Sequence, residues 1–151
     1  MKKLLIPKDK DPMGQAIADF HQKGGAKLLR VFSSQFEEDE IPVKQLFRIE
    51  SQMPAIERKA LEMAQGRILD VGAGSGCHSL ALQQSGKEVL AIDISSLSVD
   101  TMLSRGVRQA RQVNLFDNSF CETFDTVLML MNGSGIVGRL ENLPQFFRRM
   151  K

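Results

Sequence analysis

Residues 67–82 read RILDVGAGSGCHSLAL, and this stretch decides the fold of the chain. It begins with an apolar run of strand length, continues through glycines at positions 72, 74 and 76, and passes at once into a helical pattern. Glycine permits left-handed turn dihedrals and lets a ligand approach the backbone closely. A strand, a glycine turn and a helix in this order also direct helix N–H groups and the positive end of the helix dipole at one point. The stretch therefore predicts a ligand site at the turn, with an affinity for negative charge.

Three details narrow the kind of ligand. The dinucleotide-binding fingerprint has a third glycine three residues after the second, and Cys77 stands at that place. A phosphate-binding loop ends in Gly-Lys-Ser/Thr, and this stretch has no such lysine. Asp70 lies two residues before Gly72, so both point to the same side of the strand, and its carboxylate would repel a pyrophosphate. The pattern favours a zwitterion with a positive centre beside its carboxylate, such as an amino acid that carries a sulfonium group.

A second acidic residue ends the next predicted strand. Residues 88–93 read EVLAID, so Asp93 follows the glycine turn after one helix and one apolar strand. In nucleotide-binding βαβ units an acidic residue at this position, about twenty residues on, hydrogen-bonds the ribose hydroxyls. Asp70 and Asp93 together therefore predict a nucleoside with a charged amino-acid tail as the ligand.

The two motifs LDVGAGSG (69–76) and VLAID (89–93) closely resemble the first two motifs of class I S-adenosylmethionine-dependent methyltransferases. The resemblance implies an α/β fold with a Rossmann-like parallel sheet, and S-adenosyl-L-methionine as the cofactor. It also implies that Asp70 and the glycine loop hold the methionine part and that Asp93 holds the ribose. The expected cofactor-binding residues are Asp70, Gly72, Ala73, Gly74, Gly76, His78, Asp93, Ile94, Asn114, Leu115 and Asn132.

The outer members of this set have structural alternatives. Asn114 and Leu115 stand where the family has an acidic residue that accepts a hydrogen bond from the adenine amino group, and an amide oxygen can accept as well. Asn114 is otherwise an ordinary turn residue. Asn132 follows the fourth predicted strand, where it either contacts cofactor or acceptor or forms a turn. His78 is a base toward the acceptor, a hydrogen-bond partner of the cofactor, or only a residue of the first helical turn.

The composition is that of one soluble globular domain. The chain has 151 residues, of which 42% are hydrophobic and 25% charged, and this length supports a single core. A net charge of +2 is too small for a nucleic-acid-binding surface. The sequence shows no membrane-spanning segment and no metal-ligand spacing. The two cysteines, Cys77 and Cys121, have no disulfide spacing and predict buried thiols in a reducing cytoplasm.

Residues 1–65 are expected to form a leader and a helical cap. Residues 1–12 predict a mobile polar leader, residues 13–23 a helix, and the acidic run 37–40 a solvated loop. A second helix opens at Pro54, and its predicted buried stripe consists of Ile56, Ala60, Met63 and Ala64. This part resembles the cap that precedes the first strand in many methyltransferases, and it is expected to close the site against water.

Residues 66–151 are expected to form the first half of the S-adenosylmethionine-binding domain. Four strands are predicted at 67–71, 88–93, 107–113 and 124–131. The third is rich in Arg and Gln, which suits a sheet edge, whereas the fourth is apolar almost throughout, which suits burial on both faces. Right-handed crossovers then give the order 3-2-1-4. Helices are predicted at 75–85, after Ser95, where Val99, Met102 and Leu103 are expected to face inward, and after Asn142.

The predicted sheet is incomplete by the pattern of the family, in which further strands follow. We therefore expect a fragment of a longer enzyme, with the fourth strand as an open edge through which the isolated chain forms a homodimer or remains marginally stable. The predicted reaction of the parent is methyl transfer to a small-molecule or protein acceptor. Two alternatives remain open, an oxidoreductase that binds a nicotinamide dinucleotide and a module that binds S-adenosylmethionine without catalysis.

Overall fold

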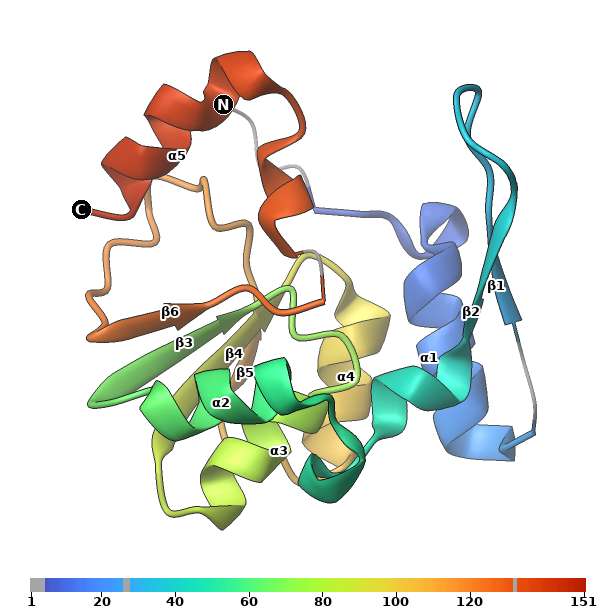
Figure 1. The fold of residues 1–151 in the computed structure, drawn as a ribbon, viewed down its shortest axis with the longest axis horizontal. Helices are drawn as coiled ribbons and strands as arrows, with labels where there is room; N and C mark the ends of the chain where they lie inside the picture. Colours follow the sequence, from blue (N-terminus) through green and yellow to red (C-terminus); the bar gives the residue numbers. More distant parts are fainter. Residues whose placement is uncertain (1–4, 26–27, 132) are drawn as a thin grey trace.

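The computed structural model describes residues 5–25, 28–131 and 133–151. Its centre is a parallel sheet in the order β5-β4-β3-β6, with helices on both faces (Figure 1). The strands of this sheet are β3 (Arg67–Val71), β4 (Glu88–Asp93), β5 (Ala110–Gln112) and β6 (Thr126–Leu128). The helices are α1 (Pro12–Lys23), α2 (Ala55–Met63), α3 (Cys77–Gln84), α4 (Ser96–Ser104) and α5 (Leu143–Arg149). The predicted α/β class and strand order 3-2-1-4 are confirmed.

The two central strands are buried because both of their faces are covered. On one face, Ile68 and Val89 pack with Leu82 of α3 and Leu61 of α2. On the other face, residues of β3 and β4 pack with the segment after β5 and with α5. The members of this second cluster are Leu69, Val71, Leu90, Ile92, Leu115 and Phe120, with Phe146 and Met150 against them. Alternation along each strand thus supplies a separate apolar layer to each side.

The third and fourth strands are shorter than predicted. β5 pairs with β4 only from Ala110 to Gln112, at the polar edge that its composition predicts. β6 pairs with β3 only from Thr126 to Leu128, and it is half-buried rather than covered on both faces. The expectation of an almost fully buried strand from 124 to 131 is therefore wrong, because the chain leaves the sheet after Leu128.

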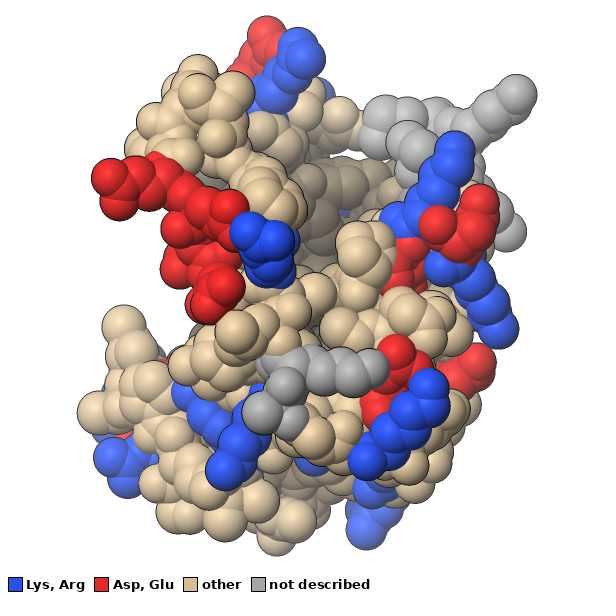
Figure 2. Space-filling model, turned by 90° about the vertical axis from the view of Figure 1, so that its right-hand side faces the viewer, with Lys and Arg blue, Asp and Glu red and all other residues tan. Residues whose placement is uncertain are grey.

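The N-terminal part packs beside the carboxyl end of the sheet. It consists of α1, an antiparallel hairpin of β1 (Leu28–Val31) and β2 (Asp39–Pro42), and the short 3₁₀ helix η2 (Val43–Phe47). The hairpin projects on the right in Figure 1 and faces the viewer in Figure 2, where acidic side chains gather beside a hollow of the surface. The exposed acidic run of residues 37–40 partly belongs to β2, so the prediction of a loop holds only for its first half.

The prediction of an unstructured leader is wrong for residues 5–12. The N–H of Ile6 donates to the carbonyl of Ile94, and Ile6 forms an isolated parallel bridge with Ser95. Asp11 is buried, and its carboxylate accepts hydrogen bonds from Gly14 N–H at 2.8 Å and from the hydroxyl of Ser95. The leader is polar in composition, but backbone pairing and a helix cap hold it against the sheet.

Three predictions of burial are also wrong. Ile56 and Met63 of α2 are exposed, whereas Ala64 is buried as predicted and Leu61, which lies outside the predicted stripe, is buried as well. Leu103 of α4 is half exposed at 48%. Of the two thiols, Cys77 is buried as predicted but Cys121 is exposed, and both are free.

The part of the chain that the structure describes contains no helix that is both long and apolar enough to cross a membrane.

Candidate functional site

Two adjoining cavities lie at the carboxyl ends of β3 and β4, the edge of a parallel sheet where open α/β folds bind ligands. The first has a volume of about 350 Å³ and the second about 400 Å³. Both are lined by Gly72, Asp93, Ile94 and Gly133. The shared residues make the two cavities parts of one continuous site.

The glycine loop forms the floor of the site. Gly72 and Gly74 have φ values of +67° and +56°, which an L side chain rarely adopts. A Cβ atom on Gly72 would meet nothing within 4 Å, so the bend is open toward the cavity. The N–H groups of Gly72 and Ala73 donate to the carbonyl of Ile92, and that of Gly74 donates to Asp93. These three amides are therefore already used within the protein, and the glycines contribute close approach of a ligand to the backbone.

Asp93 lies between the two cavities with its carboxylate fixed by the backbone. Oδ2 accepts from Gly74 N–H at 2.9 Å, and Oδ1 accepts from Ser95 N–H at 2.9 Å. Burial raises the pKa of Asp93, while these backbone hydrogen bonds act in the opposite direction and the charge of Asp11 adds to the rise. Each oxygen retains a further lone pair for a hydroxyl donor, so the residue can hold a diol.

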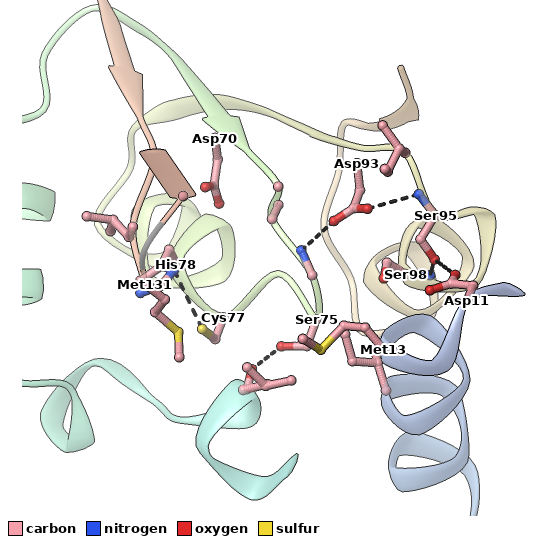
Figure 3. Close-up of a pocket in the computed structure, with 18 of the residues that line it drawn as sticks. Asp11, Met13, Asp70, Ser75, Cys77, His78, Asp93, Ser95, Ser98 and Met131 are labelled. Atoms are coloured by element: carbon pink, nitrogen blue, oxygen red, sulfur yellow. Dashed lines mark hydrogen bonds between the residues drawn. The ribbon is translucent and has the colours of Figure 1, made fainter. Parts of the chain in front are cut away.

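Asp70 lies at the back of the first cavity and is only 2% exposed. The hydroxyl of Ser79 donates to its Oδ2 at 2.7 Å. Burial raises the pKa of Asp70, and the hydrogen bond from Ser79 and the charge of His78 oppose that rise. Figure 3 shows Asp70 and Asp93 on the two sides of the glycine loop. Both acids line one cavity, as the sequence predicts.

His78 also lines the first cavity, where it binds the N-terminal part of the chain. Its Nε2 lies 2.8 Å from Oε2 of Glu57, and Arg48 donates to the same oxygen at 2.9 Å. Burial alone would lower the pKa of His78, but the contact and charge of Cys77 and the hydrogen bond with Glu57 raise it to about 9. This raised pKa favours the charged imidazole, and its contact with Glu57 links α3 to α2.

A second set of contacts joins the glycine loop to α1 and η2. The guanidinium of Arg105 donates to the carbonyl of Ser75 at 2.6 Å and lies 4.7 Å from the ring centroid of Phe47. The ring of Phe47 in turn packs at 4.7 Å on that of Phe20. The hydroxyl of Ser75 donates to the carbonyl of Leu46. Residues of three separate segments thus hold the cap against the glycine loop.

Sequence reasoning missed most of the wall that the N-terminal part contributes to the first cavity. The missed residues on this wall are Ile6, Asp11, Met13, Ile17, Ile41 and Leu46. The pair Asp11-Pro12 was the available signal, since an acidic cap before a proline marks a helix start. With this signal, α1 would have been placed one residue earlier and Asp11 recognised as ordered.

Two of the predicted residues lie in the second cavity rather than the first. Asn114 and Leu115 line the second cavity together with Ile92, Val113 and Phe116. Oδ1 of Asn114 accepts from Phe116 N–H at 2.9 Å, which gives the residue a role in its turn.

One further predicted residue among the described positions, Gly76, lines neither cavity. Gly76 lies behind the loop, where an added Cβ would meet side-chain atoms of Met102 and Val107 at 2.9 Å. Asn132 lies outside the described residues. The remaining predicted residues, Asp70, Gly72, Ala73, Gly74, His78, Asp93 and Ile94, all line the first cavity.

Comparison with known proteins supports one family. Residues 69–151 match the family described as "Methyltransferase domain". A SAM-dependent methyltransferase from Bacteroides fragilis, crystallised in complex with S-adenosyl-L-homocysteine, is 71% identical in sequence to this chain. The two structures superpose with a TM-score of 0.94, and the match covers 99% of this chain and 62% of that chain. A sugar N-methyltransferase from Streptoalloteichus is 20% identical with a TM-score of 0.52, over 81% of this chain and 53% of that chain, and shares the fold.

A curated relative is the cypemycin N-terminal methyltransferase of a Streptomyces species. It is 39% identical over 69 residues, which are 43% of this chain and 28% of that protein. The chain therefore spans less than two thirds of the length of each of these relatives.

Proposed function

This chain belongs to the methyltransferase-domain family, and we propose that it binds S-adenosyl-L-methionine and contributes to methyl transfer from it to a small-molecule or protein acceptor. The observation that carries the proposal is the pairing of Asp70 and Asp93 in one cavity, on the two sides of a glycine bend that is open to it. A cation and a nucleoside are both accommodated by this arrangement. The resemblance of the two sequence motifs to the family supports the same ligand.

The chemistry of the walls supports one orientation of the ligand. The first cavity carries the carboxylates of Asp11, Asp70 and Asp93, which suit the ammonium and sulfonium charges of the methionine part. The second cavity is lined mainly by apolar side chains such as Val71, Ile92 and Leu115, which suit a planar adenine ring. Asp93 lies in both, where its carboxylate would accept hydrogen bonds from the hydroxyls of the ribose that joins the two parts.

The contribution of the protein to the reaction is positioning. The bound cofactor would supply a methyl group that its sulfonium charge has already activated. The glycine loop and the two carboxylates orient the ligand, and the cap residues Met13 and Leu46 exclude water from the first cavity. Fixed orientation removes much of the entropic cost of bringing two reactants together. A base is required only where the acceptor must lose a proton.

Calorimetric titration tests the cofactor. S-adenosyl-L-homocysteine is expected to bind with a dissociation constant in the micromolar range, whereas NAD is expected to bind at least tenfold more weakly because its pyrophosphate meets the Asp70 carboxylate. Asp70→Ala should weaken the first titration, and the exposed residue Asp100 provides a control substitution to Ala. Tighter binding of NAD would instead favour the oxidoreductase alternative.

The acceptor is tested by transfer of a labelled methyl group. One relative is an N-terminal methyltransferase, so peptide amines belong in the panel together with small amines, alcohols and thiols. Label on any acceptor class supports the enzyme, and binding without transfer to every class would favour the non-catalytic module.

We also propose a homodimer that pairs β6, an edge of the sheet, with its copy. Light scattering should then show a dimer that a proline in β6, Val127→Pro, converts to monomer, and a monomer at every concentration would contradict it. A reducing cytoplasm is the proposed setting, which the two free thiols support.

A further inference from the structure

Two methionine side chains line the first cavity although both are partly exposed to solvent. Met13 lies in the first turn of α1 and Met131 follows β6, and their exposed fractions are 43% and 41%. Figure 3 shows the two side chains well separated across the pocket. Methionine is usually buried in soluble proteins, and its flexible, polarisable thioether is common on surfaces that bind varied apolar ligands. The position of the two thioethers therefore suits contact with an apolar ligand.

The backbone of Met131 is a second sign of a ligand at this wall. Among the residues that the structure describes, Met131 is the one non-glycine residue with a positive φ, at +55°. A long side chain rarely adopts this conformation, and such outliers cluster at ligand sites, where the surrounding structure holds them. Arg48 donates to Sδ of Met131 at 3.4 Å and is itself paired with Glu57. The side chain of Met131 is thus held at the cavity at the cost of a strained backbone.

The remaining walls beside the two methionines are apolar as well. Ile41 of the hairpin and Leu46 of η2 line the cavity from the N-terminal part, and Leu130 lines it from the segment after β6. In the binding mode proposed above, the charged methionine part of the cofactor is held by Asp70 and the glycine loop. The apolar walls have no role in holding those charges, so they remain available to the acceptor.

The charges that line the first cavity are mostly negative. Among the described residues that line it there is no lysine or arginine, and its one histidine, His78, is paired with Glu57. The carboxylates that line it are those of Asp11, Asp70 and Asp93. The cavity therefore attracts a cationic ligand and repels an anionic one.

The hairpin adds a further carboxylate beside the cavity. Alternate residues of a strand share a face, so Asp39 lies on the same face of β2 as Ile41, which lines the cavity. Figure 2 shows acidic side chains beside a hollow on this side of the molecule. A cation is therefore favoured during its approach as well as inside the cavity.

We propose that the methyl acceptor is an amine with an aromatic or other apolar body, which binds between Met13 and Met131, and that an anionic acceptor of the same shape is excluded. The proposal rests on the proposed function, which places the cofactor on the carboxylate side of the cavity. The thioethers pack against the apolar body, and the carboxylates of the cavity attract the ammonium form of the amine.

Four small molecules separate the effect of charge from that of shape. Phenethylamine and phenylacetate carry opposite charges on an aromatic body, whereas ethanolamine and glycolate carry opposite charges on a polar body. Each is titrated at pH 7 into protein saturated with S-adenosyl-L-homocysteine. Phenethylamine should bind about tenfold more tightly than phenylacetate, because of charge, and about tenfold more tightly than ethanolamine, because of apolar burial. Glycolate should bind most weakly, and equal or tighter binding of phenylacetate or ethanolamine would overturn the proposal.

Nuclear magnetic resonance of labelled methionine methyl groups reports where the amine binds. Met13→Leu and Met131→Leu identify the two wall signals among the eight methionines of the chain. Phenethylamine should shift both signals. Met63 is the internal control, because it is 66% exposed on α2 and lines neither cavity, and its signal should stay in place. A titration that leaves both wall signals unchanged would place the amine elsewhere and overturn the proposal.

Matched lysine substitutions test the charge of the wall. Met131→Lys adds a cation at the cavity, whereas Met63→Lys adds the same cation on an exposed helix surface. Met131→Lys should lower the preference for phenethylamine over phenylacetate by about tenfold, and Met63→Lys should change it less than twofold. Thermal melts check that the variants are folded, and Met13→Lys applies the same test from the other side of the pocket. An unchanged preference in the wall variants would overturn the proposal.

The titrations distinguish failure of this proposal from failure of the proposed function. Protein that does not bind S-adenosyl-L-homocysteine contradicts the proposed function, and the acceptor class is overturned with it. Protein that binds S-adenosyl-L-homocysteine but prefers phenylacetate keeps the proposed cofactor and contradicts only the acceptor class.

Discussion

Asp93 and Gly74 are joined by a 2.9 Å hydrogen bond from the backbone N–H of the glycine to Oδ2 of the carboxylate. The bond fixes the glycine bend of one strand to the acidic end of the next. Asp93→Ala removes this anchor together with the expected acceptor for the ribose. Hydrogen bonds to charged groups contribute about 1.5–3 kcal/mol each, so binding of S-adenosyl-L-homocysteine should weaken about 10–100-fold in calorimetry. Asp100→Ala, on the exposed side of α4, should leave the affinity within twofold, and equal affinities for both variants would remove Asp93 from the site.

Asp70→Asn should separate stability from binding. Burial raises the pKa of Asp70 above its ordinary value, so the folded state binds the proton more tightly than the unfolded state. The free energy of unfolding therefore falls as the pH rises from the pKa of the unfolded state to the raised pKa of the folded state. The neutral amide avoids that cost and can still accept from Ser79. The free energy of unfolding at pH 7 should stay unchanged or rise by about 1 kcal/mol. S-adenosylmethionine should lose more affinity than S-adenosylhomocysteine, since only the former carries the sulfonium charge, and equal losses would contradict a carboxylate–sulfonium contact.

The Glu57–His78 pair predicts a window of pH dependence. The pKa of His78 is raised from 6.5 to about 9, so its contribution to stability is complete below pH 6.5 and is lost as the pH rises through about 9. Burial alone would raise the pKa of Glu57, but hydrogen bonds from His78 and Arg48 lower it below 4.5, and its contribution is lost as the pH falls below that value. Glu57→Gln should therefore cost about 2 kcal/mol near pH 6 and less at pH 10, where only the pair with Arg48 remains charged. Denaturant unfolding at the two pH values measures the difference, and a cost independent of pH would exclude the Glu57–His78 pair as a contributor.

Lys87 should be a large single contributor to the stability of α2. Its ammonium donates to the carbonyls of Leu61, Glu62 and Ala64 at 2.6, 3.0 and 2.8 Å, which occupies the end of the helix where carbonyls lack partners. Lys87→Met should cost about 1–3 kcal/mol in the free energy of unfolding. Lys59→Met, which removes an exposed ion pair with Glu62, should cost less than about 0.5 kcal/mol. Similar costs for the two variants would show that the three carbonyls are equally well solvated without Lys87.

Two glycines provide a matched pair for steric strain. Gly66 and Gly86 both precede strands and have φ values of +63° and +80°, so either alanine costs about 1 kcal/mol for its backbone conformation alone. A Cβ on Gly66 would lie 2.2 Å from Oδ2 of Asp125, whereas one on Gly86 would meet nothing within 4 Å. Gly66→Ala should therefore be at least about 2 kcal/mol more destabilising than Gly86→Ala, because Asp125 also accepts from Arg67 N–H. Equal melting temperatures would mean that the Asp125 side chain moves away freely.

The sheet could be predicted because its signals are local. The apolar strand 88–93 has the bounds that its composition predicts, and the polar strand after Gly106 lies at the edge. The buried face of α2 could not be predicted from hydropathy, because the helix turns Glu57 inward to meet Arg48 and His78 and thereby exposes Ile56. An ion pair between segments that are distant in sequence leaves no periodic pattern along the chain.

In the candidate site, too, some residues are signalled by the local sequence and others are brought in only by tertiary packing. Asp70, Asp93 and the glycine bend follow from spacing along two strands, and both acids line one cavity. The opposite wall is built by Ile6, Met13 and Ile41, which precede the sheet in sequence and reach it only through tertiary packing. Their hydrophobicity predicts burial somewhere, but not which surface they cover.

The bridge between Ile6 and Ser95 has a practical consequence for anyone who produces the protein. Ile6 is also part of the cavity wall, so an affinity tag or a fluorescent fusion that disturbs the backbone pairing of Ile6 would disturb the wall as well. Recombinant material for ligand studies should therefore carry its tag elsewhere or have it removed by a protease that leaves few foreign residues.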